Sequence, residues 1–403
     1  MMSRWVWLLA FATGLAGVLV GCSGSEKVPT PAQPYDLTPE AMRTSQLGKP
    51  VADSLAAALA KSTVPAAKPV HVLAVSGGGQ YAAFNAGLLT GWTCQGTRPT
   101  FDVVTGISSG AIVASYAFLG SKYDKQLQRF FTNISDKDLF TYRPVVELVS
   151  NGSIANPKKL EKLIERETSD EFLFDLRQAH QEGRRLYIGT MNVRTRRVTI
   201  WDVGAIACSG RPEAVEMVRK VFLAAGSIPG LLPSVKFDVE IEGVRYIEEH
   251  VDGGAACQTF VRLGQGAERP VEGATGWLVG SNLYTMAAGK LYAPPLEGKL
   301  GFLKRVTSTI SAALYALYRA ELVNLYSFCG ISGMKFHLVT IPDDAPIPPN
   351  SMTFDTESMR RLYALGFDNG RKGIPWRLTA PGAELGEEEA PRDRPNTFHL
   401  PSK

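Results

Sequence analysis

Several patterns that would point to nucleic acid, a metal or a membrane span are missing from this sequence of 403 residues. Its net charge is only +4, with 43 basic residues interspersed among 39 acidic ones, so we expect no nucleic acid partner. Its cysteines include no Cys-x-x-Cys pair and its five histidines form no cluster, so we predict no metal. The apolar run at residues 5–20 is shorter than the ~20 residues of a membrane-spanning helix, which makes a permanent span the weaker interpretation.

The composition is that of a globular protein, because 45% of the residues are hydrophobic and 20% are charged. We expect one large domain, since α/β enzymes often exceed the commonest domain size without splitting. Four cysteines follow the amino-terminal region, and the sequence leaves open which of three pairings they form or whether they stay thiols. They are Cys94, Cys208, Cys257 and Cys329.

The amino terminus is typical of a secretion signal, because Arg4 precedes the apolar run and small residues lead to Cys22. The stretch LVGCS at residues 19–23 resembles the lipobox of bacterial lipoproteins, which implies that the Cys22 thiol carries lipid. The alternative is an ordinary cleavage site with a chance cysteine. Ser23 in place of Asp is similar to the pattern sorted to the outer membrane, so we expect a membrane-anchored lipoprotein of the bacterial cell envelope.

Composition divides the chain into four parts. We predict a lipoprotein signal peptide at residues 1–21 and a membrane-proximal spacer rich in Pro, Ala, Ser and Lys at residues 22–67. A single globular domain is expected at residues 68–375, and a polar tail at residues 376–403. The body of the protein is therefore expected to be tethered to a membrane through lipid on Cys22.

Two strand-turn-helix units begin the globular part. Residues 71–75 are a short apolar run, a glycine-rich turn follows, and residues 84–92 have the apolar spacing of a helix. The pattern repeats with a strand at residues 101–105 and a helix at residues 111–119. Two such units predict a parallel sheet in an α/β fold.

Later segments predict further elements of the same fold. Strands are expected at residues 185–193, 197–203, 246–251, 277–281 and 335–341, and helices at residues 157–167 and 215–225. Residues 302–328 have the spacing of a long amphipathic helix, with Val306, Ile310, Leu314 and Leu317 on one face. Such an apolar stripe is typical of a core helix, and a lid at a lipid interface is the alternative.

The pentapeptide at residues 106–110 fits Gly-x-Ser-x-Gly, in which the glycines permit a tight strand-to-helix turn that projects the serine hydroxyl. Ser108 could simply cap the following helix, as serines often do. The predicted strand before the turn and helix after it are the arrangement that the motif requires. We therefore predict that Ser108 is a nucleophile.

Gly77, Gly78 and Gly79 follow the neighbouring strand, where their amides are unshielded by side chains and suit an anion. Either a phosphate or the oxyanion of acyl transfer would fit such donors. A Walker loop needs Gly-Lys-Ser/Thr after the glycines, whereas Gln80 and Tyr81 follow here, and the dinucleotide fingerprint also fits poorly. We therefore interpret this loop as an oxyanion hole and predict no cofactor.

A serine nucleophile needs a base, and Asp252 is our choice. It ends the strand predicted at residues 246–251 and precedes two glycines, so little bulk would separate it from an incoming serine. His250 shares its face of the strand but lies one pleat back, and it remains the alternative base. Because a carboxylate is a weaker base than imidazole, a Ser-Asp pair favours esters over peptides. The remaining histidines are typical of structural positions: His71, His180, His337 and His399.

Four segments occur in the order seen in patatin-like phospholipases: residues 76–89, residues 106–110, AAGSIPGLLP at residues 224–233, and Asp252-Gly253-Gly254. The chain resembles that family over roughly residues 68–372. Residues 354–370 are also similar to the closing helix of the family's bacterial lipoprotein members.

The resemblance implies a three-layer α/β/α fold with a mostly parallel central sheet. It implies a nucleophile at Ser108, a catalytic aspartate at Asp252 and oxyanion donors among Gly77, Gly78 and Gly79. No metal and no cofactor are implied. Many family members carry Arg or Lys and then Gly after the glycine run, and this chain departs from them there.

We predict a carboxylic ester hydrolase that acts on lipid or ester substrates at a membrane surface through an acyl-enzyme intermediate. A phospholipase A, a lysophospholipase and an esterase all fit, because Gln80 and Tyr81 at the departing positions leave the lipid class open. The alternative from another class is a catalytically weak or inactive lipid-binding envelope lipoprotein. A thioesterase or protease with a His250 base is a third reading.

Overall fold

The structure is a computed structural model that describes residues 69–143, 153–241, 244–261, 278–293, 296, 298–299, 301–384 and 387. The predicted signal peptide, Cys22, the whole spacer and the tail apart from residues 376–384 and 387 lie outside the described residues. The main sheet consists of β1 (His71–Val75), β2 (Val103–Ile107), β5 (Arg185–Asn192), β6 (Arg197–Asp202), β7 (Val235–Ile241), β8 (Val244–Asp252), β9 (Asn282–Met286) and β10 (Lys335–Val339). A separate two-stranded ribbon joins β3 (Thr141–Tyr142) to β4 (Ala155–Asn156).

The sheet is mostly parallel, in the order β10-β9-β1-β2-β5-β8-β7, with β6 paired to β5. The five strands from β10 to β5 run parallel, whereas β6, β7 and β8 pair antiparallel to their neighbours. Strands β1 and β2 are buried almost throughout because helices cover both of their faces. This burial explains why both strands are continuous apolar runs in the sequence instead of alternating ones.

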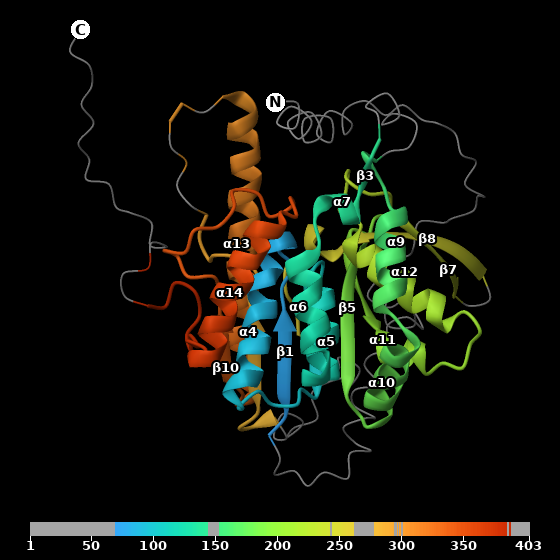
Figure 1. The fold of residues 1–403 in the computed structure, drawn as a ribbon, viewed down its shortest axis with the longest axis horizontal. Helices are drawn as coiled ribbons and strands as arrows, with labels where there is room; N and C mark the ends of the chain where they lie inside the picture. Colours follow the sequence, from blue (N-terminus) through green and yellow to red (C-terminus); the bar gives the residue numbers. More distant parts are fainter. Residues whose placement is uncertain are drawn as a thin grey trace.

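Helices lie on both faces of the sheet, as Figure 1 shows. One face carries α4 (Ala82–Gln95), α5 (Gly110–Leu119), α6 (Asp124–Asn133), α9 (Lys158–Glu167), α10 (Asp170–Gln181), α11 (Val203–Ala207), α12 (Ala214–Gly226) and α14 (Thr356–Lys372), with the short α7 (Asp136–Leu139) beside them. The long helix α13 (Phe302–Ser332) packs on the other face through Tyr318, Leu322 and Leu325. The predicted three-layer α/β/α fold with a mostly parallel sheet is confirmed.

Two of the predicted elements differ from the structure in an informative way. The strand predicted at residues 277–281 is wrong, because residues 278–280 form turns and β9 begins at Asn282. In helix α13 the stripe predicted to be core does not hold, because its residues Leu314 and Leu317 are exposed. The helix is buried instead through Tyr318, Leu322 and Leu325 in its carboxyl-terminal half. No helix in the described part of the chain is long and apolar enough to cross a membrane.

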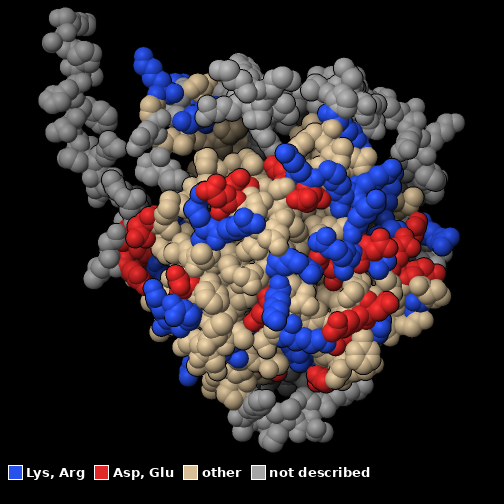
Figure 2. Space-filling model, viewed as in Figure 1, with Lys and Arg blue, Asp and Glu red and all other residues tan. Residues whose placement is uncertain are grey.

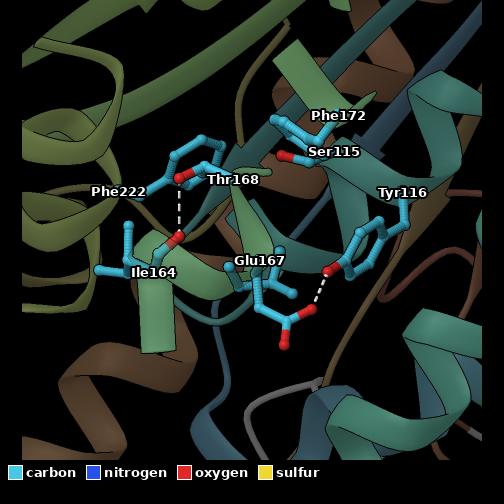
Figure 3. A pocket seen from close by; sticks show the side chains of 8 residues that line it. Ser115, Tyr116, Ile164, Glu167, Thr168, Phe172 and Phe222 are labelled. Atoms are coloured by element: carbon cyan, nitrogen blue, oxygen red, sulfur yellow. Dashed lines mark hydrogen bonds between the residues drawn. The ribbon is translucent and has the colours of Figure 1, made fainter. Parts of the chain in front are cut away.

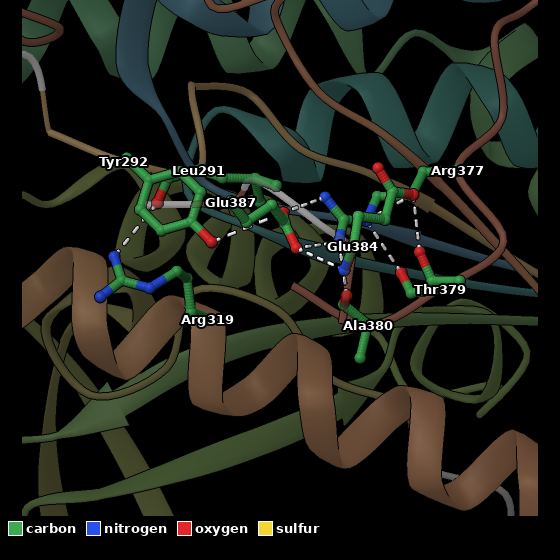
Figure 4. A network of polar contacts seen from close by, with 8 residues as sticks. All are labelled: Leu291, Tyr292, Arg319, Arg377, Thr379, Ala380, Glu384 and Glu387. Atoms are coloured by element: carbon green, nitrogen blue, oxygen red, sulfur yellow. Dashed lines mark hydrogen bonds and ion pairs between the residues drawn. The ribbon is translucent and has the colours of Figure 1, made fainter. Parts of the chain in front are cut away.

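The segment after α14 packs back onto the edge of the sheet. Arg377 pairs with Leu338 of β10 through both backbone amides and also forms an ion pair with Glu387 (Figure 4). Trp376 packs against Trp92 and Tyr284 in the aromatic cluster beneath this edge. The predicted domain boundaries stay predictions. These contacts show that residues 376–377 still pack against the sheet.

The small net charge is reflected at the surface. On the face drawn in Figure 2, basic and acidic side chains lie next to one another and neither sign covers it. All four cysteines among the described residues are free thiols: Cys94, Cys208, Cys257 and Cys329.

Candidate active site

Strand β5 brings together two chain segments that are 144 residues apart. The parallel strand β2 ends where Ile107 pairs with Gly189 of β5. The antiparallel strand β8 approaches from the opposite direction and ends where Asp252 pairs with Thr190, the next residue of β5. The ends of β2 and β8 therefore meet at neighbouring residues of β5, which places Ser108, directly after β2, next to Asp252, the last residue of β8.

The predicted nucleophile Ser108 lies on a strained turn. Its φ is +54°, in the left-handed region that residues with a side chain seldom adopt. Gly110 permits this turn, because a Cβ at that position would lie 2.3 Å from the backbone oxygen of Ser76. Helix α5 begins at Gly110, so the hydroxyl of the half-buried Ser108 projects from the junction between β2 and the helix.

Asp252 faces Ser108 directly. The Ser108 hydroxyl donates to Asp252 Oδ2 at 2.5 Å, and the amide of Gly254 donates to Oδ1 at 2.8 Å. Asp252 thus also serves as the turn-forming aspartate that its Asp-Gly-Gly context favours. Burial raises the pKa of this carboxyl to about 6, even though both hydrogen bonds act to lower it.

Residues 224–233, which the sequence matched to patatin-like proteins without a role, hold this strand end. The backbone oxygen of Ser227 accepts a hydrogen bond from the amide of Asp252 at 2.9 Å. Gly226 and Ile228 line the hollow next to Ser108. This segment therefore both supports Asp252 and forms part of the wall beside it.

His250, the alternative base, contacts residues other than Ser108. Its ring is fully buried, its Nδ1 lies 2.9 Å from Thr190 Oγ1, and its Nε2 lies 3.1 Å from Glu248 Oε2. Both ring nitrogens are therefore occupied by neighbours other than Ser108. The other described histidines also have structural contacts: His71 stacks on Tyr284, His180 lies beside Asp202, and His337 bonds to Asn282.

The three glycines after β1 differ in whether their backbone amides donate a hydrogen bond within the protein. The amide of Gly77 donates to the backbone oxygen of Gln258 at 3.1 Å. Among the described residues, no protein acceptor bonds to the amides of Gly78 and Gly79. Gly79 has a φ of +54°, and a Cβ there would lie 2.1 Å from the backbone oxygen of Ser351. A Cβ at Gly77 would lie 3.1 Å from Ser108 Cβ, so the loop runs alongside the serine.

Gln80 and Tyr81, where many patatin-like proteins carry a cation, tie the glycine loop to the chain before α14. The Gln80 side chain donates to the Asn350 backbone oxygen at 2.5 Å, and its backbone amide donates to Ser351. The Tyr81 hydroxyl donates to the backbone oxygen of Pro348. Sequence reasoning found the departure here but not its role, because the partners lie about 270 residues away.

A hollow opens beside Ser108, and its lining is mainly apolar. Helix α5 contributes Ala111 and Ile112, and helix α9 contributes Leu160, Leu163 and Ile164. The remaining lining residues are Gly79, Ser109, Phe130, Leu139, Phe140, Glu167, Phe222, Gly226, Ile228 and Phe354. Sequence reasoning missed this wall. The amphipathic spacing of residues 158–167 shows one apolar face, which a core helix would show equally well.

Part of the chain matches a known protein family. Residues 73–261 match the family model described as Patatin-like phospholipase. This range of the chain is similar to patatin-like phospholipases. It contains the glycine loop, Ser108 and Asp252. The match supports a lipid hydrolase.

Two solved structures are also similar to this protein. VipD from Legionella pneumophila is 13% identical, with a TM-score of 0.36 over 75% of this chain. The type III effector protein ExoU is also 13% identical, with a TM-score of 0.30 over 75% of this chain. This chain spans 66% of VipD and 52% of ExoU. No curated protein sequence matches it.

Proposed function

We propose that this protein is a serine lipid acyl hydrolase of the phospholipase A, lysophospholipase or esterase type. The observation that carries the proposal is the 2.5 Å contact between Ser108 Oγ and Asp252 Oδ2, made at a strained turn beside an apolar hollow. Such strain persists only where the surrounding structure imposes it, and it clusters at active sites.

In the acylation step Asp252 removes the proton of Ser108 as the serine oxygen attacks the ester carbonyl. A carboxyl with a pKa of about 6 remains mostly ionised at neutral pH and is a stronger base than an ordinary aspartate. The proton then passes from Asp252 to the departing alkoxide, and an acyl-Ser108 ester remains. An alcohol leaving group needs less acid assistance than an amine, which favours esters over peptides.

The negative oxygen of the tetrahedral intermediate is bound by backbone amides of the glycine loop. We assign this role to Gly78 and Gly79, whose amides have no acceptor among the described residues. The Gly77 amide is engaged with Gln258 and instead holds the loop in position. Removing such a donor typically costs ~100-fold or more in rate.

Deacylation reverses the first step with water as the nucleophile. Asp252 removes a proton from a water molecule, the resulting oxygen attacks the acyl-Ser108 carbonyl, and the serine leaves with the proton as the fatty acid is released. The same carboxylate therefore acts as base in both halves of the cycle. No metal or cofactor enters either step.

We also propose that the enzyme works on a membrane surface to which lipid on Cys22 anchors it. This proposal rests on the lipobox-like residues 19–23. Several acyl chains hold a protein on a bilayer far more firmly than one chain does. Anchoring in the bacterial envelope, at the outer membrane by the Ser23 pattern, would keep the domain close to its lipid or ester substrate. Incorporation of labelled palmitate that is lost in Cys22→Ala tests this part.

The chain purified in detergent tests the proposed reaction with p-nitrophenyl esters, phospholipids and a fluorophosphonate probe. We expect Ser108→Ala to lose probe labelling and hydrolysis, whereas Ser121→Ala, an exposed serine outside the site, keeps both. Hydrolysis that persists in folded Ser108→Ala would refute the nucleophile. A native protein that binds lipid vesicles yet neither hydrolyses them nor reacts with the probe would support the non-catalytic alternative.

A further inference from the structure

The base and the oxyanion donors of the proposed site belong to separate segments of the chain. Asp252 ends β8, whereas Gly78 and Gly79 follow β1, and the strands β2 and β5 lie between these two. Acyl transfer needs such groups held within about 0.5 Å of their productive geometry. Glycines supply little of that rigidity, because a backbone without side chains has the greatest conformational freedom. Other residues must therefore hold the glycine loop in place relative to Asp252.

Gln258 contacts both segments. Its backbone oxygen accepts a hydrogen bond from the Gly77 amide at 3.1 Å, and its side-chain Nε2 donates to the backbone oxygen of Gly254 at 2.6 Å. One residue thus joins the loop after β1 to the turn after β8. We refer to these two contacts as the Gln258 bridge.

The Gln258 bridge completes a series of hydrogen bonds around the nucleophile. From Gly77 the series passes through Gln258 to Gly254. The Gly254 amide donates to Asp252 Oδ1 at 2.8 Å, and Oδ2 of the same carboxyl accepts from the Ser108 hydroxyl at 2.5 Å. Ser108 in turn lies alongside Gly77, where an added Cβ would be 3.1 Å from Ser108 Cβ. A displacement of Gln258 therefore moves the oxyanion loop and the base relative to the nucleophile.

The glycine loop is held on its other side as well. The Gln80 amide donates to the backbone oxygen of Ser351 at 2.8 Å. The amides of Gly78 and Gly79 therefore lie between this contact and the Gln258 bridge. The positions of the two proposed oxyanion donors depend on both.

Glu321 of helix α13 anchors Gln258. Its carboxylate accepts a hydrogen bond from the Gln258 amide at 3.0 Å and from the Thr259 amide at 3.1 Å. Hydrogen bonds to an ionised acceptor are shorter and stronger than those between neutral groups. Burial raises the pKa of Glu321, and the hydrogen bonds that it accepts oppose this rise. Helix α13 thus contributes an anchor for the chain that follows the base.

Glu167, another carboxylate near the site, has different partners. It lines the hollow beside Ser108. The Tyr116 hydroxyl donates to Glu167 Oε2 at 2.5 Å, as Figure 3 shows, and Arg166 lies 2.8 Å from Oε1. Glu321 is therefore the carboxylate that holds the chain after Asp252.

We propose that Gln258 is a positioning residue for the proposed hydrolysis, that it fixes the oxyanion donors relative to Asp252, and that Glu321 holds Gln258 in place. The proposal rests on the proposed function and adds two residues to it that act through the backbones of Gly77 and Gly254. Neither residue lines the hollow, so we expect both to affect the chemical step more than substrate binding.

The first test measures kcat and KM of the full chain for a p-nitrophenyl ester in Gln258→Met. Methionine has a similar length but cannot donate to Gly254. We expect kcat to fall about thirtyfold while KM changes less than about twofold, because misplaced oxyanion donors weaken binding of the transition state and not of the ester. Gln128→Met, at an exposed position of α6, is the matched control and should keep both native constants. Gln258→Asn, which is one methylene shorter, repeats the test if Gln258→Met does not fold.

The pH profile separates positioning from a purely structural role. The Gly254 amide acts to lower the pKa of Asp252, and it is held less firmly once the contact to Gln258 is lost. The midpoint of kcat/KM against pH should therefore lie about half a pH unit higher in Gln258→Met than in the native protein. A general loss of stability would reduce the amount of folded enzyme without moving this midpoint.

Two substitutions test the role of Glu321. Glu321→Ala removes the acceptor of the Gln258 and Thr259 amides and should lower kcat about as much as Gln258→Met. Glu321→Gln retains an acceptor oxygen and should recover kcat to within about threefold of the native value. Gln258→Met combined with Glu321→Ala should cost little more than either change alone, since both act through one bridge. Fully additive losses would contradict the assignment of Glu321 as the anchor.

Hydrogen exchange tests the bridge without relying on activity. The amides of residues 76–82 should exchange at least about threefold faster in Gln258→Met and Glu321→Ala than in the native protein and Gln128→Met. Unchanged exchange would overturn the bridge whatever the activity. Native kcat in Gln258→Met, with Ser108→Ala inactive, would overturn the positioning role and leave the proposed hydrolase standing. Faster exchange together with no hydrolysis by the native protein would support the bridge and refute the proposed reaction.

Discussion

Asp252 and His250 lie two residues apart on β8, yet their surroundings differ completely. His250 is enclosed by aromatic rings, and Thr190 and Glu248 occupy its two nitrogens. Asp252 is also buried, but its contacts are a serine hydroxyl and one backbone amide, with no cation among its close partners. Histidine is the more usual base for a serine, but the residue that can act as base here is the one left without a competing partner.

The comparison also shows why burial has opposite consequences at the two positions. At His250 every polar atom of the ring is satisfied, so burial stabilises the fold through packing. At Asp252 burial opposes the ionised form and raises the pKa to about 6, which is useful for a base but costs stability. The residue that we propose as the base and the residue that stabilises the fold therefore lie on the same strand, and three experiments test this division of roles.

The largest effect is expected for Asp252→Asn. Without the carboxylate we expect kcat/KM for esters to fall about 10³-fold or more, because positioned bases contribute 10²–10⁴-fold and the amide cannot take a proton. The variant should nevertheless be more stable at pH 7.5, by up to about 3 kcal/mol, since it removes a buried charge whose pKa lies about two units above its ordinary value. Ester kinetics and urea unfolding measure the two effects.

The sign of the stability change provides a further check on this variant. A raised carboxyl pKa means that the folded state binds the proton more tightly, so the native protein loses stability as pH rises from about 4 to 6. The advantage of Asp252→Asn should therefore vanish below about pH 4 and be complete above about pH 6. A variant that is less stable than the native protein at pH 7.5 would contradict the strained-base interpretation.

The pH dependence of catalysis is the second experiment. Because only the ionised carboxylate accepts the serine proton, kcat/KM should level off above the Asp252 pKa of about 6 and fall about tenfold per pH unit below it. Initial rates with a neutral ester between pH 4.5 and 8.5 give the profile. A midpoint near 4 would mean that the carboxyl is not shifted in the working enzyme, and Asp252 would lose its assignment as a tuned base.

The smallest effect on activity is expected for His250→Gln. The amide can replace part of the hydrogen bonding to Thr190 and Glu248, so kcat/KM should change by less than about threefold, while stability falls by about 1–3 kcal/mol. Circular dichroism during urea unfolding, with ester kinetics on the same samples, makes the comparison. Loss of activity in a variant that keeps its stability would reverse the roles that we give to Asp252 and His250.

Much of this site was predictable because its parts are local. The turn around Ser108 needs glycine at positions 106 and 110 for steric reasons, and the Gly77–Gly79 loop needs residues without side chains, so both are visible as short motifs. The strands at the carboxyl end were harder to place. The apolar run at residues 277–281 predicts a strand, whereas β9 begins at Asn282, because an apolar run alone does not fix where pairing with β1 starts.

By itself the sequence determined the parallel α/β sheet, the position of the serine turn and the preference for Asp252, because periodicity and backbone sterics act over a few residues. Only the tertiary structure decided that β2 and β8 end at neighbouring residues of β5, that His250 is occupied, and that Gln80 anchors the glycine loop to Asn350. Contacts between residues far apart in the chain depend on register and packing, which no local pattern encodes.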